Sequence, residues 1–421
     1  MRILFLTQIV PYPPDAGPKV KTWHVLRYLV DRGHEVILAT FMRTEEETHV
    51  ATLRDLCAEV YTVPINRSRI MDAMYWIRSH ITGRPFLVER DDIVAMRALV
   101  SRLITSHSVD AVHADQLTMT QFAFNRGVLV DHKPYFVFDA HNAVWAIVER
   151  TKQNAPRYLK PLLAIESRRI KLYEGMVVQN YDHTLAVTDV DREYLLQARN
   201  SYLNRPHNGI NQKNCAQSPM ITTFPITVDT THLQPINRHP GSKNILTLGT
   251  LHYPPNADGI RWFVREVFPS VREHVPDVTL TIVGKNPPQD LLQLASSESQ
   301  SITVTGYVPD LKPYMEEAAL MVVPVRAGSG MRVRILEAFA RAMPVVTTTI
   351  GLEGIDAQAG EDVLIEDTPS MFSSAVVSLL KDITLQAQLA ANGRRIALER
   401  YDWKTGLRGL DKVYKMTNGT N

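Results

Sequence analysis

The sequence has few of the features that mark several common classes of protein. Its 421 residues include only two cysteines, Cys57 and Cys215, with no CxxC pair and no cluster of cysteine and histidine. This excludes a disulfide scaffold, argues against a structural zinc site and favours a reducing compartment. Charge of one sign is also lacking. Because the net charge is only +2, we expect no nucleic-acid partner.

Long hydrophobic runs are absent as well. No apolar run approaches the roughly 20 residues that span a bilayer. The N-terminal stretch MRILFLTQIVPYPP has only the short apolar core ILFL before Gln8 and several prolines, which is not typical of a signal peptide. We therefore expect a cytoplasmic protein and leave open a peripheral contact with the inner face of the cell membrane.

The composition is that of a globular protein, with 45% hydrophobic and 21% charged residues. Since single cores stop growing near roughly 250–300 residues, this length predicts two domains. Short β-branched runs alternate with helical patterns, which indicates parallel sheets covered on both faces. One helical pattern covers 20–33, where Gly33 is expected to end the helix. Strands are predicted at 2–6, 35–40, 58–63, 110–114, 135–140 and 184–188, and again at 245–250, 278–284, 301–306, 320–325, 344–349 and 362–366.

Between these two series lies an irregular stretch at 200–244, rich in Asn, Pro, Gly, Ser and Thr, as in a linker. We therefore predict an α/β protein with two doubly wound, Rossmann-like domains that face each other across a cleft. Residues 1–225 form the N-terminal domain and residues 226–400 the C-terminal one. The amphipathic tail, 401–421, is expected to return to the first domain as a helix.

The stretch RAGSGMRVRILEAFARAMPVV, residues 326–346, combines two glycines with several arginines where a strand gives way to a helix. Ligands of open α/β sheets bind at the carboxyl ends of strands, and a helix N-terminus suits phosphate. Gly330 allows a close approach of backbone, while Arg332 and Arg334 add guanidinium donors. Glu337, about one turn further on, can accept hydrogen bonds from sugar hydroxyls. The stretch thus predicts a nucleotide-sugar site, although an ordinary turn with solvated arginines remains an alternative.

Three other groups of polar residues carry weaker signals. His113 and Asp115 share one face of a strand, and a hydrogen-bonded structural pair is favoured over an acceptor-site role. His141 follows another strand and either faces a ligand or caps the strand. Asp189, Asp191 and Glu193 have the spacing of metal ligands, but acidic residues also favour the first turn of a helix, and that interpretation is preferred.

Two helical stretches combine apolar and basic residues, 158–178 and 69–86. Either can lie on an anionic bilayer and so reach a lipid-linked acceptor. The favoured interpretation for both is an ordinary amphipathic helix, with one face in the core and the other in water.

Taken together in their order and spacing, these segments resemble the retaining glycosyltransferases of the GT-B fold in glycosyltransferase family 4, and in particular the bacterial sugar transferases of exopolysaccharide systems. The resemblance covers nearly the whole chain. It depends on PYPPDAG (11–17), DAHN (139–142), LAVTDVDREYL (185–195), ITVDTTHLQP (226–235), LGTLHYPPNADGIRWF (248–263), TIVGKNP (281–287), VTGYVPDLKPYMEEA (304–318), GSGMRVRILEAFARAMPVVTTTIGLEGI (328–355) and YDW (401–403).

The resemblance implies roles for particular residues. Glu337 matches the glutamate that binds the donor ribose, and the backbone around Val308 matches the segment that holds the nucleobase. Gly17 lies in the loop that approaches the reacting sugar, and His141 matches a histidine that faces the donor sugar. The family is metal-independent and transfers sugar with retention of configuration, and its nucleotide sugar is a substrate, with no further cofactor.

Two departures from the family pattern stand out. Many members carry a second glutamate eight residues before the first, where this sequence has Ser329. Many also carry an arginine and a lysine after the first strand of the second domain, whereas residues 249–259 contain no Lys or Arg. Arg332 and Arg334, with Lys285, are expected to supply the missing charge toward the donor diphosphate.

The resulting prediction is a hexosyltransferase that moves a sugar from a nucleoside-diphosphate sugar to a glycan, a lipid-linked acceptor or a small molecule. Two alternatives keep the fold. One is a nucleotide-sugar epimerase, and the other, suggested by Ser329, is a non-catalytic partner subunit.

Overall fold

The computed structural model describes residues 1–123, 133–205, 220–297, 301–328 and 330–415, so Cys215, Ser329 and the end of the predicted tail lie outside the described residues. Contacts divide the chain into two compact units, each described here by itself. Unit 1 comprises Met1–Ile226 and Leu407–Asn421, and unit 2 comprises Thr227–Gly406. The sequence placed the boundary at 225/226 and the return of the tail at 401.

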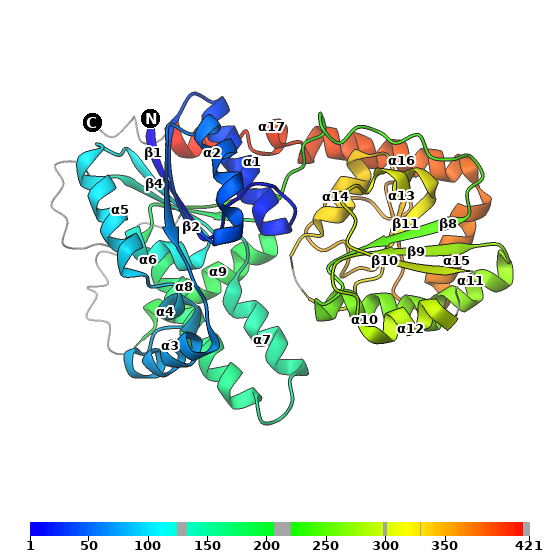
Figure 1. The fold of residues 1–421 in the computed structure, drawn as a ribbon, viewed down its shortest axis with the longest axis horizontal. Helices are drawn as coiled ribbons and strands as arrows, with labels where there is room; N and C mark the ends of the chain where they lie inside the picture. The colour runs from blue at the N-terminus through cyan, green and yellow to red at the C-terminus, as the bar shows by residue number, and fades with distance from the viewer. Residues whose placement is uncertain (124–132, 206–219, 298–300, 329, 416–421) are drawn as a thin grey trace. The chain divides into compact units, whose positions relative to one another are not determined.

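Unit 1 is a seven-stranded parallel sheet with helices packed against it (Figure 1). Its strands are β1 (Arg2–Thr7), β2 (Glu35–Met42), β3 (Glu59–Pro64), β4 (Ala111–Asp115), β5 (Tyr135–Asp139), β6 (His183–Ala186) and β7 (Met220–Thr223). Its helices are α1 (Gly17–Asp31), α2 (Val50–Leu56), α3 (Arg69–Thr82), α4 (Phe86–Arg90), α5 (Val94–Ser106), α6 (Thr120–Ala123), α7 (Val144–Asn154), α8 (Lys160–Asn180), α9 (Asp189–Leu203) and α18 (Leu410–Lys415).

Unit 2 repeats this architecture with a six-stranded parallel sheet, and Figure 1 shows helices on both of its faces. Its strands are β8 (Asn244–Leu248), β9 (Thr279–Val283), β10 (Ile302–Gly306), β11 (Ala318–Val323), β12 (Val345–Thr347) and β13 (Leu364–Ile365). Its helices are α10 (Pro254–Trp262), α11 (Phe268–His274), α12 (Gln289–Ser297), α13 (Lys312–Glu317), α14 (Val333–Ala340), α15 (Pro369–Lys381), α16 (Ile383–Ile396) and α17 (Trp403–Gly406).

The two sheets have the same doubly wound strand order, β3-β2-β1-β4-β5-β6-β7 in unit 1 and β10-β9-β8-β11-β12-β13 in unit 2. The order reverses between β1 and β4 in unit 1 and between β8 and β11 in unit 2. In sheets of this kind such a reversal, the topological switch point, opens a crevice at the carboxyl ends of the strands. The prediction of two parallel-sheet α/β domains is confirmed, and each domain has one switch point at which to look for a site.

The sequence specifies these strands through continuous hydrophobic runs. Ile3, Leu4, Phe5 and Leu6 of β1 are all fully buried, as a parallel strand covered on both faces requires. Helix α1 covers this sheet with an apolar face that includes Leu26 and Leu29, and Gly33 follows it with a φ of +79°.

Among the described residues, one strand was not predicted from the sequence. Residues 220–223 fall inside the stretch assigned to a linker, yet they form β7, which pairs in parallel with β6. Met220 at its start is 41% exposed. A strand of four residues at the edge of a sheet buries little side-chain surface, and so it leaves no hydrophobic run in the sequence.

The tail joins unit 1 from Leu407 onward. Tyr414 of α18 is buried, and its hydroxyl lies 2.6 Å from Nδ1 of His113 in β4. Asp411 accepts hydrogen bonds from Tyr28 and Arg32 of α1. Helix α18 thus bonds both α1 and the central strand β4 of the first sheet.

Candidate functional site

The loops that follow β8, β9 and β10 meet at the carboxyl end of the second sheet. The backbone N–H of Gly249 donates to Val283 (3.0 Å), and that of Gly284 donates to Gly306 (2.9 Å). A Cβ on Gly284 would lie 1.8 Å from the carbonyl oxygen of Gly249, so only glycine fits there. This close packing brings three strand ends together beside the switch point.

The turn at 326–332 approaches the same place from β11. Gly328 and Gly330 have φ values of +108° and +85°, a backbone conformation that glycine tolerates and most residues do not. Arg332 is the N-cap of α14, and no side chain caps the helix there. The helix N-terminus therefore keeps backbone donors and a partial positive charge for an anion.

Arg334 connects the two sides of the switch point. From the first turn of α14 its Nη1 donates to the carbonyl oxygen of Leu248 at the end of β8 (2.7 Å), and its Nη2 donates to Oδ1 of Asn256 in α10 (2.9 Å). Burial, followed by repulsion from Arg332, lowers the pKa of Arg334 to about 10, so the guanidinium is still charged at neutral pH. The second departure noted above concerns this loop, which lacks cations of its own. Arg334 brings one to it from another strand end.

The other arginines of the turn have different contacts. Nη1 of Arg332 donates to the carbonyl oxygen of Gly330 (2.7 Å), within its own turn. Arg326 pairs with Asp258 of α10 at 3.1 Å, and its guanidinium lies over the Trp262 ring. Arg326 thus has a structural role, whereas Arg332 and Arg334 stay at the helix mouth.

Glu337 lies on α14, one turn beyond Arg332, and is half-buried. Burial raises the pKa of this carboxyl, and the nearby Arg341 and Arg334 oppose the rise. Within the described residues, no hydrogen bond or ion pair engages the carboxylate. A partly buried acceptor of this kind is suited to hydroxyl donors of a ligand.

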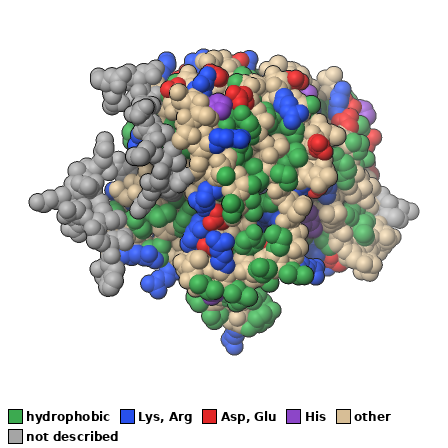
Figure 2. Space-filling model, turned by 60° about the vertical axis from the view of Figure 1, so that its left-hand side comes forward, with side chains coloured by type: hydrophobic (Ala, Val, Ile, Leu, Met, Phe, Trp, Pro, Cys, Tyr) green, Lys and Arg blue, Asp and Glu red, His purple; other side chains and the backbone are tan. Residues whose placement is uncertain are grey.

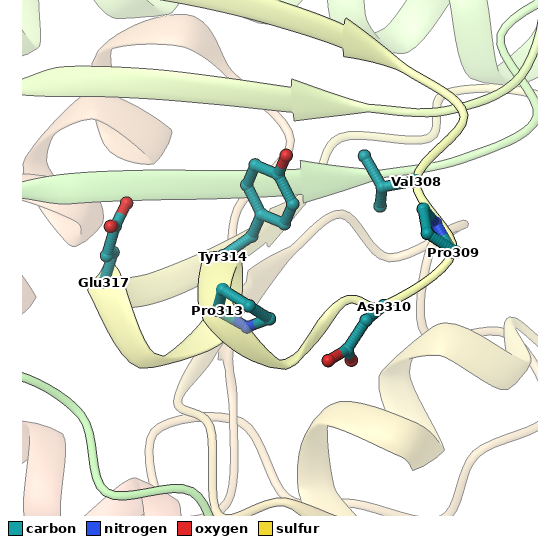
Figure 3. Close-up of a pocket in the computed structure, with 6 residues that line it drawn as sticks. All are labelled: Val308, Pro309, Asp310, Pro313, Tyr314 and Glu317. Carbon is teal, nitrogen blue, oxygen red and sulfur yellow. The ribbon is translucent and has the colours of Figure 1, made fainter.

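A pocket of about 430 Å³ opens beside Val308, between the end of β10 and α13. Figure 3 shows the ring of Tyr314 in the middle of its lining, with Val308 and Glu317 on opposite sides. The remaining lining residues are Pro309, Asp310 and Pro313. Next to this segment, the Lys285 ammonium lies 4.6 Å from the centre of the Tyr307 ring. The pocket is partly apolar and contains an aromatic ring and two carboxylates in its lining, features that suit a heterocycle with polar edges.

At the switch point of unit 1 a histidine and a carboxylate replace the arginines. Nε2 of His141 lies 2.7 Å from Oδ1 of Asp115, which ends β4. The other oxygen of Asp115 accepts from the hydroxyls of Thr7 at the end of β1 (2.9 Å) and Thr22 of α1 (3.0 Å). Asp115 is fully buried and the His141 side chain is 11% exposed, so a buried carboxylate holds one ring nitrogen of a histidine at the surface. Gly17 begins α1, the helix whose Thr22 bonds Asp115.

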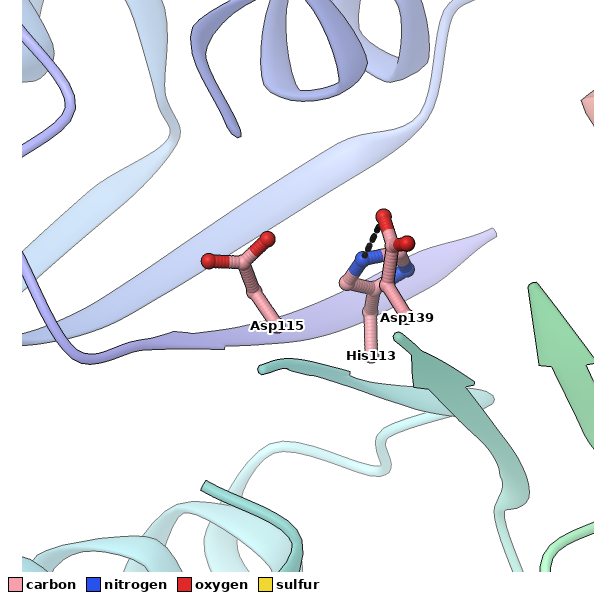
Figure 4. Close-up of side chains that lie close together, drawn as sticks. All are labelled: His113, Asp115 and Asp139. Carbon is pink, nitrogen blue, oxygen red and sulfur yellow. Dashed lines mark ion pairs between the residues drawn. The ribbon is translucent and has the colours of Figure 1, made fainter. Parts of the chain in front are cut away.

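The pair predicted between His113 and Asp115 does not form. His113 instead contacts the Tyr414 hydroxyl and, at 3.4 Å, Oδ2 of Asp139 (Figure 4). Figure 4 shows the Asp115 carboxylate to one side of that contact. The register of β4 and β5 pairs Asp139 with Asp115 and so leaves it diagonally across from His113, a cross-strand contact that spacing within one strand cannot reveal.

The closest approach to a metal-binding group among the described residues is made by His113, Asp115 and Asp139, whose ligand atoms lie within 4.8 Å of one another. The ammonium of Lys21, itself 2% exposed, is bonded to Asp139. Although burial alone would raise the pKa of Asp139, Lys21 and then His113 hold it well below its usual range. A divalent ion would have to displace this ammonium, so the group is better described as a buried ion pair.

Sequence reasoning missed Lys21, Thr7 and Thr22, which complete this cluster. A signal was available, because Lys21 lies four residues before the buried Val25 and therefore on the core-facing side of α1.

Asp189 and Asp191 lie in the first turn of α9, where the Thr188 hydroxyl accepts from the backbone N–H of Asp191 (3.0 Å). The interpretation of these acids as a helix start is thus confirmed.

Two parallel-sheet α/β units with this strand order are the architecture of the GT-B fold. Comparison with known proteins agrees. Residues 242–382, from β8 to the end of α15, match the family described as glycosyl transferases group 1. Sucrose-phosphate synthase from Thermosynechococcus elongatus has a similar fold over 100% of both chains, with a TM-score of 0.69 and 13% identity. HepE from Anabaena, solved with UDP and glucose, superposes with a TM-score of 0.66 at 13% identity over 99% of this chain and 100% of its own.

Proteins of similar sequence agree with the comparison of folds. An uncharacterised 44.6 kDa protein from the cps region of Klebsiella pneumoniae is 22% identical over 96% of this chain and 97% of its own length. Phosphatidyl-myo-inositol mannosyltransferase from Mycobacterium leprae is 25% identical over 55% of this chain and 58% of its own. Together these likenesses support a GT-B glycosyltransferase. In the part of the chain that the structure describes, no helix has the length and hydropathy needed to span a bilayer.

Proposed function

We propose that this protein transfers a sugar, with retention of configuration and without a metal, from a nucleoside-diphosphate sugar to a glycan or a lipid-linked acceptor. The observation that carries the proposal is the position of Arg334, which holds a half-buried positive charge across the switch point of unit 2. The neighbour solved with UDP and glucose and the relative named as a mannosyltransferase support a donor of this class.

In this proposal each part of the donor meets one group of unit 2. The diphosphate binds the N-terminus of α14, with Arg332, Arg334 and Lys285 nearby, and Gly330 lets its oxygens approach the backbone. The ribose hydroxyls donate to Glu337, and the base occupies the pocket at Val308. Ser329 lies outside the described residues, and its assignment to the donor site remains part of the proposal.

The chemistry follows from the charge on the leaving group. The bond between the anomeric carbon and the diphosphate oxygen breaks, and its electron pair leaves with the nucleoside diphosphate. A hydroxyl oxygen of the acceptor forms the new glycosidic bond, and its proton passes to an oxygen of the departing diphosphate. Cations fixed where the negative charge grows stabilise the transition state more than the bound donor. This fixed positive charge takes the part that a metal ion plays in other transferases, and no further cofactor is needed.

Unit 1 supplies the side of the reaction that faces the sugar and its acceptor. Asp115 fixes the ring of His141 through one nitrogen, so the other nitrogen is presented in a defined direction. Gly17 keeps the loop before α1 small near the reacting sugar. His141 thus acts on the sugar, and Asp115 serves as its positioning residue.

The test is a panel of UDP- and GDP-sugars incubated with the full chain, with and without glycan and polyprenyl-phosphate acceptors. The proposal predicts that nucleoside diphosphate is released only with one donor class and rises when an acceptor is present. Conversion of the donor into its epimer would instead establish the epimerase alternative. The absence of both donor binding and turnover with every donor would favour the partner subunit.

A further inference from the structure

Helix α3 of unit 1 carries its hydrophobic side chains on the outside of the molecule. Ile70, Met74, Ile77 and Ile81 are 76%, 65%, 55% and 81% exposed. Their spacing of three or four residues places them on one face of the helix. Trp76 and Met71 flank that face and are 44% and 38% exposed. The expectation that this stretch places its apolar face in the core is wrong.

The opposite face of α3 is the one that meets the protein, and it is polar. Ser79 is the one buried residue of the helix, and Asp72 and Tyr75, which share its face, are half-buried. Thr82 donates to Oε1 of the buried Glu89 at 2.9 Å. The usual pattern of a surface helix is therefore inverted, since polar groups hold the helix in place and apolar groups face away.

The inversion is not a consequence of a poorly formed helix. Ser68 caps the N-terminus by accepting from the backbone N–H of Met71 (3.2 Å). Gly83 ends the helix in the left-handed conformation, with a φ of +72°. Both ends therefore have the signals of a defined helix. Figure 2 shows hydrophobic side chains gathered near the lower edge of the face in view, and Figure 1 places both α3 and the turn between α7 and α8 at that end of unit 1.

The charges around this helix are arranged with the cations outermost. Arg78 pairs with Glu89 at 2.9 Å, with side-chain exposures of 53% and 0%. Arg84 bonds both Glu89 and Asp92, and is 31% exposed while those carboxylates are 0% and 10% exposed. Arg69, at the start of the helix, is also exposed. The surface beside the apolar face thus offers guanidinium groups, while the acids lie beneath them.

From this arrangement we infer that α3 docks on an anionic phospholipid bilayer, with Ile70, Met74, Ile77 and Ile81 among the acyl chains and the arginines at the phosphate level. An apolar face bordered by cations and a tryptophan is the pattern of helices that lie in the membrane interface. This inference does not depend on the proposed transferase activity, although it would bring a lipid-linked acceptor within reach of unit 1.

A second copy of the chain fits this surface less well. A helix of 14 residues is about 21 Å long and about 10 Å wide, so its outer face offers about 200 Å². Stable protein interfaces bury about 800 Å² on each partner. A bilayer needs no matching surface and can accept one helix by itself.

The other helix considered for contact with a membrane behaves differently. In α8, Ile170 and Val177 are buried, so the later part of its apolar stripe packs in the core as the ordinary amphipathic interpretation expected, whereas Leu162 and Ile165 near its start are 36% and 48% exposed. The Lys171 ammonium lies 3.9 Å from the centre of the Trp145 ring, and Arg169 is within 4.0 Å of Glu166. We therefore assign the docking face to α3, where four apolar side chains of one face are each more than half exposed, and assign no separate docking role to α8.

The test is flotation of the full chain with vesicles of phosphatidylcholine mixed with phosphatidylglycerol. The variant replaces Ile70, Met74, Ile77 and Ile81 with serine, and the matched control replaces the exposed Met371, Ile383 and Leu398 of unit 2 with serine. We expect the α3 variant to lose vesicle affinity by at least roughly tenfold, and the control to retain it. Added salt and vesicles of phosphatidylcholine alone should each weaken binding of the wild type.

A second measurement does not require the multiple variant to fold. Fluorescence of Trp76, isolated by difference from Trp76→Phe, should be quenched by brominated lipids in the same vesicles. Equal flotation of wild type and α3 variant, or no quenching of Trp76, would overturn the inference. So would a dimer in sedimentation equilibrium without lipid that the α3 substitutions dissociate, since the face would then be a contact between copies.

Discussion

The two units have the same strand order but opposite chemistry at their switch points. In unit 1 the ends of β1 and β4 are joined through the hydroxyl of Thr7 and the carboxylate of Asp115. In unit 2 the end of β8 is joined to the helix after β11 through the guanidinium of Arg334. The same strand order therefore places a carboxylate at the switch point of unit 1 and a guanidinium at the switch point of unit 2. The comparison teaches that the fold provides the position, and that a few side chains decide which ligand it suits.

The difference also extends to how charge is compensated. The acids of unit 1 are paired inside the protein, Asp139 with Lys21 and Asp115 with two hydroxyls and His141. Among the described residues, the hydrogen bonds of the Arg334 guanidinium go to uncharged oxygens of Leu248 and Asn256, and no carboxylate lies within ion-pair distance, although Glu337 is near enough to interact electrostatically. A half-buried cation of this kind is in position to gain an anionic partner from a ligand. We therefore assign the diphosphate to unit 2 and not to unit 1.

The largest effect is expected from breaking the buried pair of unit 1. Removing one partner of such a pair leaves an uncompensated charge and costs about 3–5 kcal/mol. Lys21→Met should therefore lower the free energy of unfolding by that amount in denaturant titrations. The matched control is Lys19→Met on the same helix, because Lys19 has only longer contacts, 3.6 Å to Asp15 and 3.8 Å to Glu46. If both variants lose the same free energy of unfolding, the buried pair of Lys21 and Asp139 does not stabilise unit 1 in the way proposed.

A somewhat smaller effect is expected at Glu337, and it concerns activity alone. Each hydrogen bond from a ribose hydroxyl to a charged carboxylate contributes about 1.5–3 kcal/mol, so Glu337→Gln should lower transfer by roughly a hundredfold. Its thermal midpoint should stay close to that of the wild type, since no described residue bonds the carboxylate. Glu399→Gln, at an exposed residue paired with Arg395, is the control. A Glu337 variant with normal transfer would remove this residue from the donor site.

Acid pH should reduce the difference in stability between the wild type and Lys21→Met. Lys21 and His113 depress the pKa of Asp139 below its value in the unfolded chain, about 3.9, even though burial opposes them. A carboxyl group with a depressed pKa contributes stability above that value and loses it as pH falls further. The gap between wild type and Lys21→Met should therefore be largest at neutral pH and narrow below about pH 4. Denaturant titrations at pH 7 and pH 3 measure it, and a constant gap would contradict the assignment.

Much of the fold followed from the sequence, because buried parallel strands are continuous hydrophobic runs and the helices between them are periodic. The position of Arg332, Arg334 and Glu337 at the start of one helix could also be predicted, since these residues are close together in the chain, and their role toward a donor stays a prediction. What could not be predicted depends on contacts between distant segments. No residue near Leu248 in the sequence indicates that Arg334 bonds the Leu248 carbonyl. Likewise, no residue near Asp139 indicates that Lys21 forms an ion pair with it. Periodicity gave the apolar face of α3 but not the side on which the protein lies.

The measurement that tests the central account most directly is a calorimetric titration of the full chain with UDP and GDP, alongside uridine and guanosine. The comparison uses wild type, Arg334→Met and Arg326→Met, because Arg326 lies in the same turn but pairs with Asp258. We predict that a diphosphate binds the wild type more tightly than its nucleoside, and that Arg334→Met removes roughly tenfold or more of this advantage. Arg326→Met should keep the advantage, as expected for an exposed pair. An advantage unchanged in Arg334→Met would contradict the assignment of the diphosphate to this switch point.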